Sequence, residues 1–139
     1  MNLLSNNKKK VLIVDDSIYA RKLLKKVINK TDLAEVVAEA SNGTEAIDLY
    51  KIFKPDLVTV DLVMPKKGGF ETIEDLIRYD NTANIIIISA LGQEKLVLEG
   101  VKKGAKDFII KPCKDERILT VLERVLTREK ELSRVKQEI

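Results

Sequence analysis

The chain has 139 residues, of which 45% are hydrophobic and 34% charged, with a formal net charge of +3. This length and composition are typical of one globular domain with a single core. The absence of histidine excludes Ser-His-Asp and Cys-His triads, imidazole general bases and most zinc sites. The single cysteine, Cys113, excludes an internal disulfide. Because the charge is mild and no aromatic residues alternate with the lysines, we expect no direct nucleic-acid binding.

The first residues of the chain are polar and rich in lysine, apart from Leu3 and Leu4. They lack the apolar core of a signal peptide, and we expect residues 1–9 to form a flexible N-terminal tail. No apolar stretch approaches the length of a membrane span. We therefore expect no membrane insertion and a cytoplasmic location.

Short apolar runs rich in Val and Ile alternate with stretches that have helical periodicity, which predicts an α/β fold with buried parallel strands. The expected strands cover residues 10–15, 34–40, 56–61, 84–89 and 105–111. The expected helices begin at a Ser17 cap and at residues 44, 70, 93 and 114, and the last one continues to the C-terminus. Glu35 and Glu39 interrupt the second strand, as in an edge strand.

Four of these strands end at residues that can perform phosphate or metal chemistry: Asp15 and Asp16, Asp61, Ser89, and Lys111. In open α/β sheets, ligands bind in the crevice outside the carboxyl ends of the strands. We therefore expect these five side chains around one crevice. The simpler alternative, in which Asp15 and Asp16 only cap the first helix, does not account for Asp61 and Lys111.

The chemistry of this group of residues favours phosphoryl transfer. Lys111 cancels one of the three aspartate charges, and a divalent cation such as Mg²⁺, which prefers oxygen ligands, would neutralise the rest. A metal among carboxylates could hold a substrate phosphate, or an aspartate could attack the phosphorus itself. For that attack an ionised Asp61 needs no general base, Lys111 could hold the equatorial oxygens, and Ser89 could donate a hydrogen bond to one of them.

The motifs Val-Leu-Ile-Val-Asp-Asp-Ser at 11–17, Asp-Leu-Val-Met-Pro at 61–65, Ser89-Ala90 and Lys111-Pro112 resemble the receiver domain of two-component response regulators. The resemblance covers about residues 10–126. It is closest to the single-domain chemotaxis regulators, because of residues 16–21 and 104–108. It implies a doubly wound, flavodoxin-like parallel sheet of five strands in the order 2-1-3-4-5, flanked by five helices.

The resemblance also implies residue roles. Asp61 would accept a phosphoryl group from a phosphohistidine of a sensor histidine kinase or a phosphotransfer protein, in a Mg²⁺-dependent reaction. The implied metal ligands are Asp15, Asp16, Asp61 and the backbone carbonyl of Val63. Lys111 would pair with the phosphoryl oxygens and form a cis peptide with Pro112. Ser89 and Phe108 would form the switch pair, and the protein would catalyse only its own phosphorylation and dephosphorylation.

Three functions are compatible with these residues. The leading one is a stand-alone phosphorylation switch, most simply in chemotaxis or motility, that changes its affinity for a downstream target such as the flagellar motor. The second is the N-terminal receiver of a larger response regulator with a DNA-binding or enzymatic output domain. The third is a metal-dependent phosphatase of the haloacid-dehalogenase type. That type needs a second aspartate two residues after the nucleophile, where this chain has Val63.

Some positions depart from the family pattern. Lys67 and Gly68 replace a common Met-Asp, which affects the loop after Asp61, and Cys113 replaces a common aromatic residue; we expect Cys113 to be a small buried apolar residue. The predicted last helix also continues past the receiver, so residues 127–139 are expected to form a helical extension. Its apolar stripe of Leu132, Val135 and Ile139 would serve weak self-association or connect to an output domain.

Overall fold

The computed structural model describes residues 7–138, and it describes side chains for residues 7–127. The strands are β1 (Lys9–Val14), β2 (Ala34–Ala40), β3 (Leu57–Val60), β4 (Ile85–Ser89) and β5 (Asp107–Ile110). The helices are α1 (Ile18–Asn29), α2 (Gly43–Phe53), α3 (Gly69–Tyr79), α4 (Glu94–Lys103) and α5 (Asp115–Glu138). All strand pairs are parallel and the sheet order is β2-β1-β3-β4-β5, which confirms the predicted fold class.

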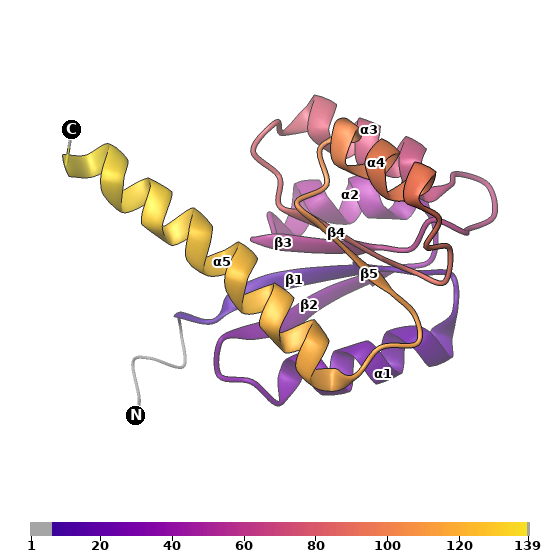
Figure 1. Ribbon diagram of the computed structural model, residues 1–139, viewed down its shortest axis with the longest axis horizontal. Coiled ribbons are helices and arrows are strands. Elements are labelled where there is room, and N and C mark those ends of the chain that lie inside the picture. Colours follow the sequence, from indigo (N-terminus) through magenta and orange to yellow (C-terminus); the bar gives the residue numbers. More distant parts are fainter. Residues whose placement is uncertain (1–6, 139) are drawn as a thin grey trace.

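The sheet separates two apolar clusters, because successive side chains of a strand point to opposite faces. Ile86 and Ile88 of β4 pack in one cluster with α1 and α5, whereas Ile85 and Ile87 pack in the other with residues of α2 and α3. Figure 1 shows the same arrangement, with α1 and α5 on one face of the sheet and α2, α3 and α4 on the other. Strands buried on both faces explain the nearly continuous Val and Ile runs.

The elements follow the predicted order, β2 has the predicted bounds, and the other predicted ends differ by two residues at most. Ser17 caps α1 by accepting a hydrogen bond from the Ala20 amide, and Gly104 ends α4 in the left-handed conformation. β2 is an edge strand, as Glu35 and Glu39 indicated. β1 begins at Lys9, inside the segment expected to be a tail, because the Lys9 amide donates to the carbonyl of Leu33.

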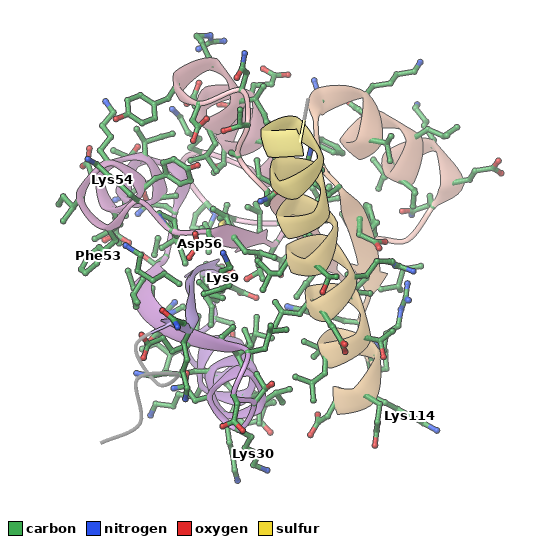
Figure 2. All side chains as sticks on the ribbon, turned by 90° about the vertical axis from the view of Figure 1, so that its left-hand side faces the viewer. Lys9, Lys30, Phe53, Lys54, Asp56 and Lys114 are labelled. Atoms are coloured by element: carbon green, nitrogen blue, oxygen red, sulfur yellow. The ribbon has the colours of Figure 1, made fainter. Side chains whose placement is uncertain are left out.

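The amino ends of the strands are fixed by polar contacts of their own. The Lys10 amide donates to the Asp56 carboxylate at 2.7 Å, and the Lys10 ammonium donates to the carbonyl of Phe53 at 2.9 Å. Figure 2 views this end of the molecule, where Lys9, Phe53 and Asp56 lie near one another. The candidate site lies at the opposite, carboxyl end of the strands.

The last helix is longer than the sheet requires. Its first half packs on the domain through Ile118, Val121, Leu122, Val125 and Leu126, all buried. The helix then continues to Glu138 and extends away from the domain (Figure 1). The side chains of the predicted stripe at Leu132 and Val135, and all of Ile139, lie outside the described residues, so the stripe stays a prediction. Within the described part, no helix has the combined length and apolar character needed to cross a bilayer.

Candidate functional site

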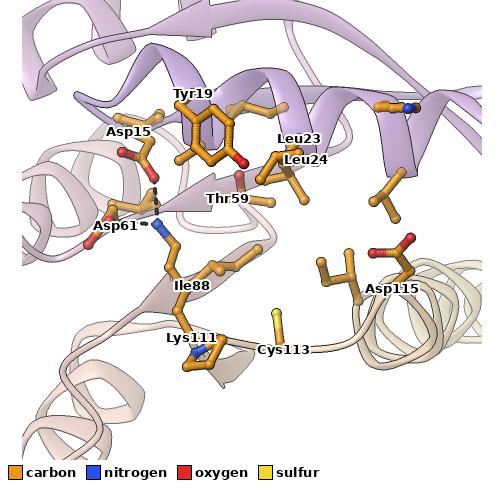
Figure 3. A pocket seen from close by; sticks show the side chains of 18 of the residues that line it. Asp15, Tyr19, Leu23, Leu24, Thr59, Asp61, Ile88, Lys111, Cys113 and Asp115 are labelled. Atoms are coloured by element: carbon orange, nitrogen blue, oxygen red, sulfur yellow. Dashed lines mark hydrogen bonds and ion pairs between the residues drawn. The ribbon is translucent and has the colours of Figure 1, made fainter.

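Lys111 brings two of the predicted aspartates together at the carboxyl ends of the strands. Its ammonium nitrogen lies 2.8 Å from Oδ2 of Asp15 and 3.0 Å from Oδ2 of Asp61 (Figure 3). The three residues follow β1, β3 and β5, so the parallel sheet is what places them side by side. The peptide bond between Lys111 and Pro112 is cis, as the resemblance implies.

Backbone amides hold the other oxygens of both carboxylates. The Ser17 amide donates to Oδ1 of Asp15 at 2.9 Å, and the Val63 amide donates to Oδ1 of Asp61 at 3.1 Å. The Asp15 residue is buried and the Asp61 side chain is only 12% exposed. Each carboxylate is therefore fixed at both oxygens, in a partly dry site where charge-assisted hydrogen bonds are strong.

Asp16 and Val63 occupy more open positions. Both residues are exposed. Within the described residues, no three His, Cys, Asp or Glu side chains are gathered as a ready-made metal cluster. Mg²⁺, however, usually binds through one or two protein carboxylates, completed by water and substrate oxygens. Two converging carboxylates, a neighbouring exposed one and a nearby backbone carbonyl fit such an open site better than a closed cage of three aspartates.

The Lys111 ammonium is charged under all ordinary conditions. Burial by itself lowers the pKa of Lys111, but the hydrogen bonds and charges of Asp15 and Asp61 outweigh it and shift the pKa upward. Lys111 is thus a permanent positive charge between the two carboxylates, suited to accept an anionic group that approaches Asp61.

Ser89 and Phe108 lie close to the site on the α4 side of the sheet. Ser89 is fully buried at the end of β4, where its hydroxyl oxygen accepts a hydrogen bond from the Leu91 amide at 3.3 Å. Phe108 of β5 is buried in the cluster that contains Ile87, its partner in the strand ladder. Both members of the predicted switch pair therefore belong to one packed layer.

A cavity of about 580 Å³ adjoins the site between α1 and the start of α5. Tyr19, Leu23 and Leu24 line its α1 side, and Cys113 lies across from them (Figure 3). Cys113 is half-buried and packs against the apolar cluster beneath α1 and α5. Burial raises the pKa of the Cys113 thiol, which agrees with the predicted role as a small, unreactive packing residue.

Two contacts, one at the site and one made by the loop after Asp61, were not predicted from the sequence. Arg21 of α1 donates to the backbone carbonyl of Asp15 at 2.6 Å. Lys67 forms an ion pair with Asp75 of α3, and its side chain lies over Gly43, where a Cβ atom would clash with it. A signal for Arg21 exists, since a cation in the first turn of a helix opposes the helix dipole and needs a partner. For Lys67 the only signal is its departure from the family pattern.

Gly69 sets how closely α3 approaches the backbone after Asp61. A Cβ atom at Gly69 would lie 2.5 Å from the Asp61 carbonyl oxygen and 2.6 Å from Leu62 Cα, whereas one at Gly68 would meet nothing nearer than 3.7 Å. We expect Gly69→Ala to lower the free energy of unfolding by about 1–3 kcal/mol, because backbone atoms cannot move aside easily. The matched Gly68→Ala makes no such clash and should lose less, about 0.5–1 kcal/mol in urea titrations, because Ala is a poorer N-cap than Gly. Equal stabilities of the two variants would contradict this close approach.

A family model of the response regulator receiver domain matches residues 11–123. The chain belongs to the response regulator receiver family. It is 46% identical over 117 residues to the chemotaxis protein CheY of Thermotoga maritima, a match that covers 84% of this chain and 97% of that protein. It is 45% identical over 115 residues to CheY of Listeria monocytogenes, with 83% and 96% covered.

Solved structures agree with this assignment. The receiver resembles the structure of the CheX-CheY-BeF3-Mg²⁺ complex from Borrelia burgdorferi with a TM-score of 0.83 and 35% identity, covering 90% of this chain and 94% of that one. It is therefore a CheY-like receiver domain, and such domains act as signalling switches and not as classical enzymes. The phosphatase alternative finds no support among these relatives.

Proposed function

We propose that this receiver is a phosphorylation-activated switch of the chemotaxis type, in which Asp61 accepts a phosphoryl group from the phosphohistidine of a sensor kinase or a phosphotransfer protein. The supporting observation is the convergence of Asp61 and Asp15 on the Lys111 ammonium. This geometry presents a carboxylate nucleophile beside a fixed positive charge. The chain's own lack of histidine is no obstacle, because the partner supplies the imidazole.

The transfer is a single displacement at phosphorus. An oxygen of the Asp61 carboxylate forms the new P–O bond as the P–N bond to the partner's imidazole breaks, and that nitrogen keeps the electron pair. The Val63 amide and Lys111 hold the Asp61 carboxylate before the attack. Lys111 then stabilises the phosphoryl oxygens, and the Ser89 hydroxyl donates to one of them.

A magnesium ion bound by this site would add further positive charge at the phosphoryl oxygens. Asp16 would bind it directly and Asp15 through a water molecule, with Asp61 and the Val63 carbonyl as the remaining protein ligands. The related CheY from Borrelia burgdorferi was solved with BeF3 and Mg²⁺, which supports this assignment.

Ser89 and Phe108 would transmit phosphorylation of Asp61 to the surface that binds the partner. A phosphoryl group on Asp61 would attract the Ser89 hydroxyl and loosen its bond with the Leu91 amide. The packing around Phe108 then changes, and with it the surface formed by α4, β5 and α5. The receiver would thereby change its affinity for a downstream protein, since a ligand shifts only states that it binds differently.

The downstream partner is proposed from the relatives. The curated CheY relatives are chemotaxis proteins, and the solved Borrelia burgdorferi CheY is in complex with CheX. A CheX-like protein or a component of the flagellar motor is therefore the kind of target that we expect. Neither a nucleic acid nor a membrane is needed for this function.

One observation favours a second candidate, a receiver that regulates an attached output domain. The chain is 38% identical to a protein-glutamate methylesterase/glutaminase of Geobacter sulfurreducens, but that match covers only 31% of the relative. In both candidates residues 10–126 form the receiver. Residues 127–139 would then be a helical extension that either self-associates weakly or connects α5 to an output domain.

Intact-mass measurement of the wild-type protein after incubation with acetyl phosphate tests the proposal. We expect one phosphoryl group per chain when Mg²⁺ is present, and none when EDTA replaces it. Hydroxylamine should remove the group, because it cleaves acyl phosphates and spares phosphoserine. Labelling that ignores EDTA or resists hydroxylamine would refute an aspartyl phosphate at this site.

A further inference from the structure

Arg21 joins the loop that carries Asp15 and Asp16 to the neighbouring strand. Its Nη1 donates to the backbone carbonyl oxygen of Asp15 at 2.6 Å, and its Nε donates to Oε1 of Glu39 in β2 at 3.1 Å. Only 13% of the Arg21 side chain is exposed. The planar guanidinium suits this task, because its donors are held in a fixed fork.

The position is an unfavourable one for a cation, which makes these contacts informative. Arg21 lies in the first turn of α1, where the helix dipole disfavours positive charge, and the first turn contains no acidic residue to balance it. Glu39 supplies the balancing charge from another element. The other end of the guanidinium donates to the Asp15 carbonyl and so satisfies a backbone acceptor next to the site.

The bonded carbonyl belongs to the peptide that links Asp15 to Asp16. A peptide unit is planar, so a hydrogen bond to its oxygen also restricts where the amide nitrogen and the Cα atom of Asp16 lie. Asp15 itself is held by the Ser17 amide and by Lys111. In contrast, no hydrogen bond or ion pair within residues 7–127 holds the exposed side chain of Asp16.

We propose that Arg21 is a positioning residue, which orients the peptide between Asp15 and Asp16 and so directs the Asp16 carboxylate toward the Mg²⁺ position. This inference rests on the proposed function, in which Asp16 is a metal ligand. Arg21 acts through that backbone and touches neither the phosphoryl group nor the ion.

A purely electrostatic role and a positioning role of Arg21 predict opposite effects of Arg21→Met on the affinity for a divalent cation. If Arg21 acted only as a nearby positive charge, its removal would make the acidic crevice more negative and would tighten the binding of a divalent cation. If Arg21 positions the loop, the same change releases Asp16 and weakens binding, by about tenfold as for other residues that orient metal ligands. The direction of the change therefore distinguishes the two roles.

The experiment measures the affinity of the full chain for Mg²⁺ by calorimetry and for Mn²⁺ by electron paramagnetic resonance. We expect weaker binding for Arg21→Met and an intermediate loss for Arg21→Lys, which keeps the charge but has no fork to bridge Asp15 and Glu39. The matched control is Lys25→Met, because Lys25 lies 3.5 Å from the same Glu39 and makes no contact with Asp15. This control should bind as wild type does.

A second readout needs no metal. Without Arg21, the amide hydrogen of Ser17 should exchange with solvent faster in the metal-free protein, because the loop that presents Asp15 to it is looser.

Unchanged or tighter metal binding by Arg21→Met would overturn the proposal, as would an equal loss in Lys25→Met. A lower melting temperature with unchanged affinity would show a purely structural role, and Arg21→Lys provides the test if Arg21→Met fails to fold. A wild-type protein without metal affinity would instead refute the proposed function itself.

Discussion

Asp61→Asn is expected to abolish phosphoryl uptake while leaving the fold intact. The amide has the shape of the carboxylate but lacks the anionic oxygen that attacks phosphorus. Incorporation from acetyl phosphate should therefore fall at least about a hundredfold, as expected when a nucleophile is removed. Intact-mass measurement over time gives the comparison with wild type.

The matched control for this variant is Asp48→Asn. Asp48 is an exposed aspartate on α2 and is not among the residues of the site. The control should be labelled at the wild-type rate, and both variants should unfold near the wild-type urea midpoint. Residual labelling of Asp61→Asn at a comparable rate would show that another residue is the acceptor.

Lys111→Met is expected to lower both the rate of phosphoryl uptake and the stability of the metal-free protein. Removing one donor to the phosphoryl oxygens should slow labelling by about a hundredfold or more. In metal-free buffer the free energy of unfolding of the variant should also be lower by about 1–3 kcal/mol, because Asp15 and Asp61 are left without their cation. This range already allows for solvent screening of the partly exposed Lys111. A divalent ion would replace that cation, so added Mg²⁺ should raise the melting temperature of the variant more than that of wild type.

Lys103→Met serves as the control for Lys111→Met, because Lys103 pairs with Glu74 at the surface, away from the crevice. It should change neither the labelling rate nor the response to Mg²⁺.

The pKa of Lys111 is raised in the folded state, so the contribution of Lys111 to stability is complete below its unfolded pKa and is lost only as pH rises through the raised value. The stability difference between Lys111→Met and wild type should therefore stay constant between pH 7 and pH 9. A difference that vanishes in this range would contradict the ion-pair geometry.

The fold was predictable from the sequence because its signals are local. Apolar runs at strand length, the Ser17 cap and Gly104 at the end of α4 each depend on a few neighbouring residues. The strand order followed from the family resemblance, which the family match supports. The grouping of Asp15, Asp61 and Lys111 was predictable for a related reason, since parallel strands bring their carboxyl ends to one edge.

The side-chain contacts of the site were not predictable in the same way. The sequence predicted which residues gather at the crevice, but it did not show that Lys111 would lie between Asp15 and Asp61 while Asp16 is exposed. The contacts of Arg21 with Asp15 and of Lys67 with Asp75 also depend on rotamers and on the packing of separate elements. Hydrophobic periodicity predicts helices and strands, but it does not predict contacts between individual side chains.

The division of the core into two clusters implies that the two faces of the sheet respond unequally to an event at Asp61. Phe108 and its neighbour Ile87 pack on the face covered by α2, α3 and α4, whereas Val121 and Leu122 of α5 pack on the other face. A rearrangement of the Phe108 ring would therefore act on α4 directly and would reach the start of α5 only through the close-packed sheet. The α4 part of the proposed signalling surface would then move more than its α5 part, and α5 would be the less mobile side of that surface.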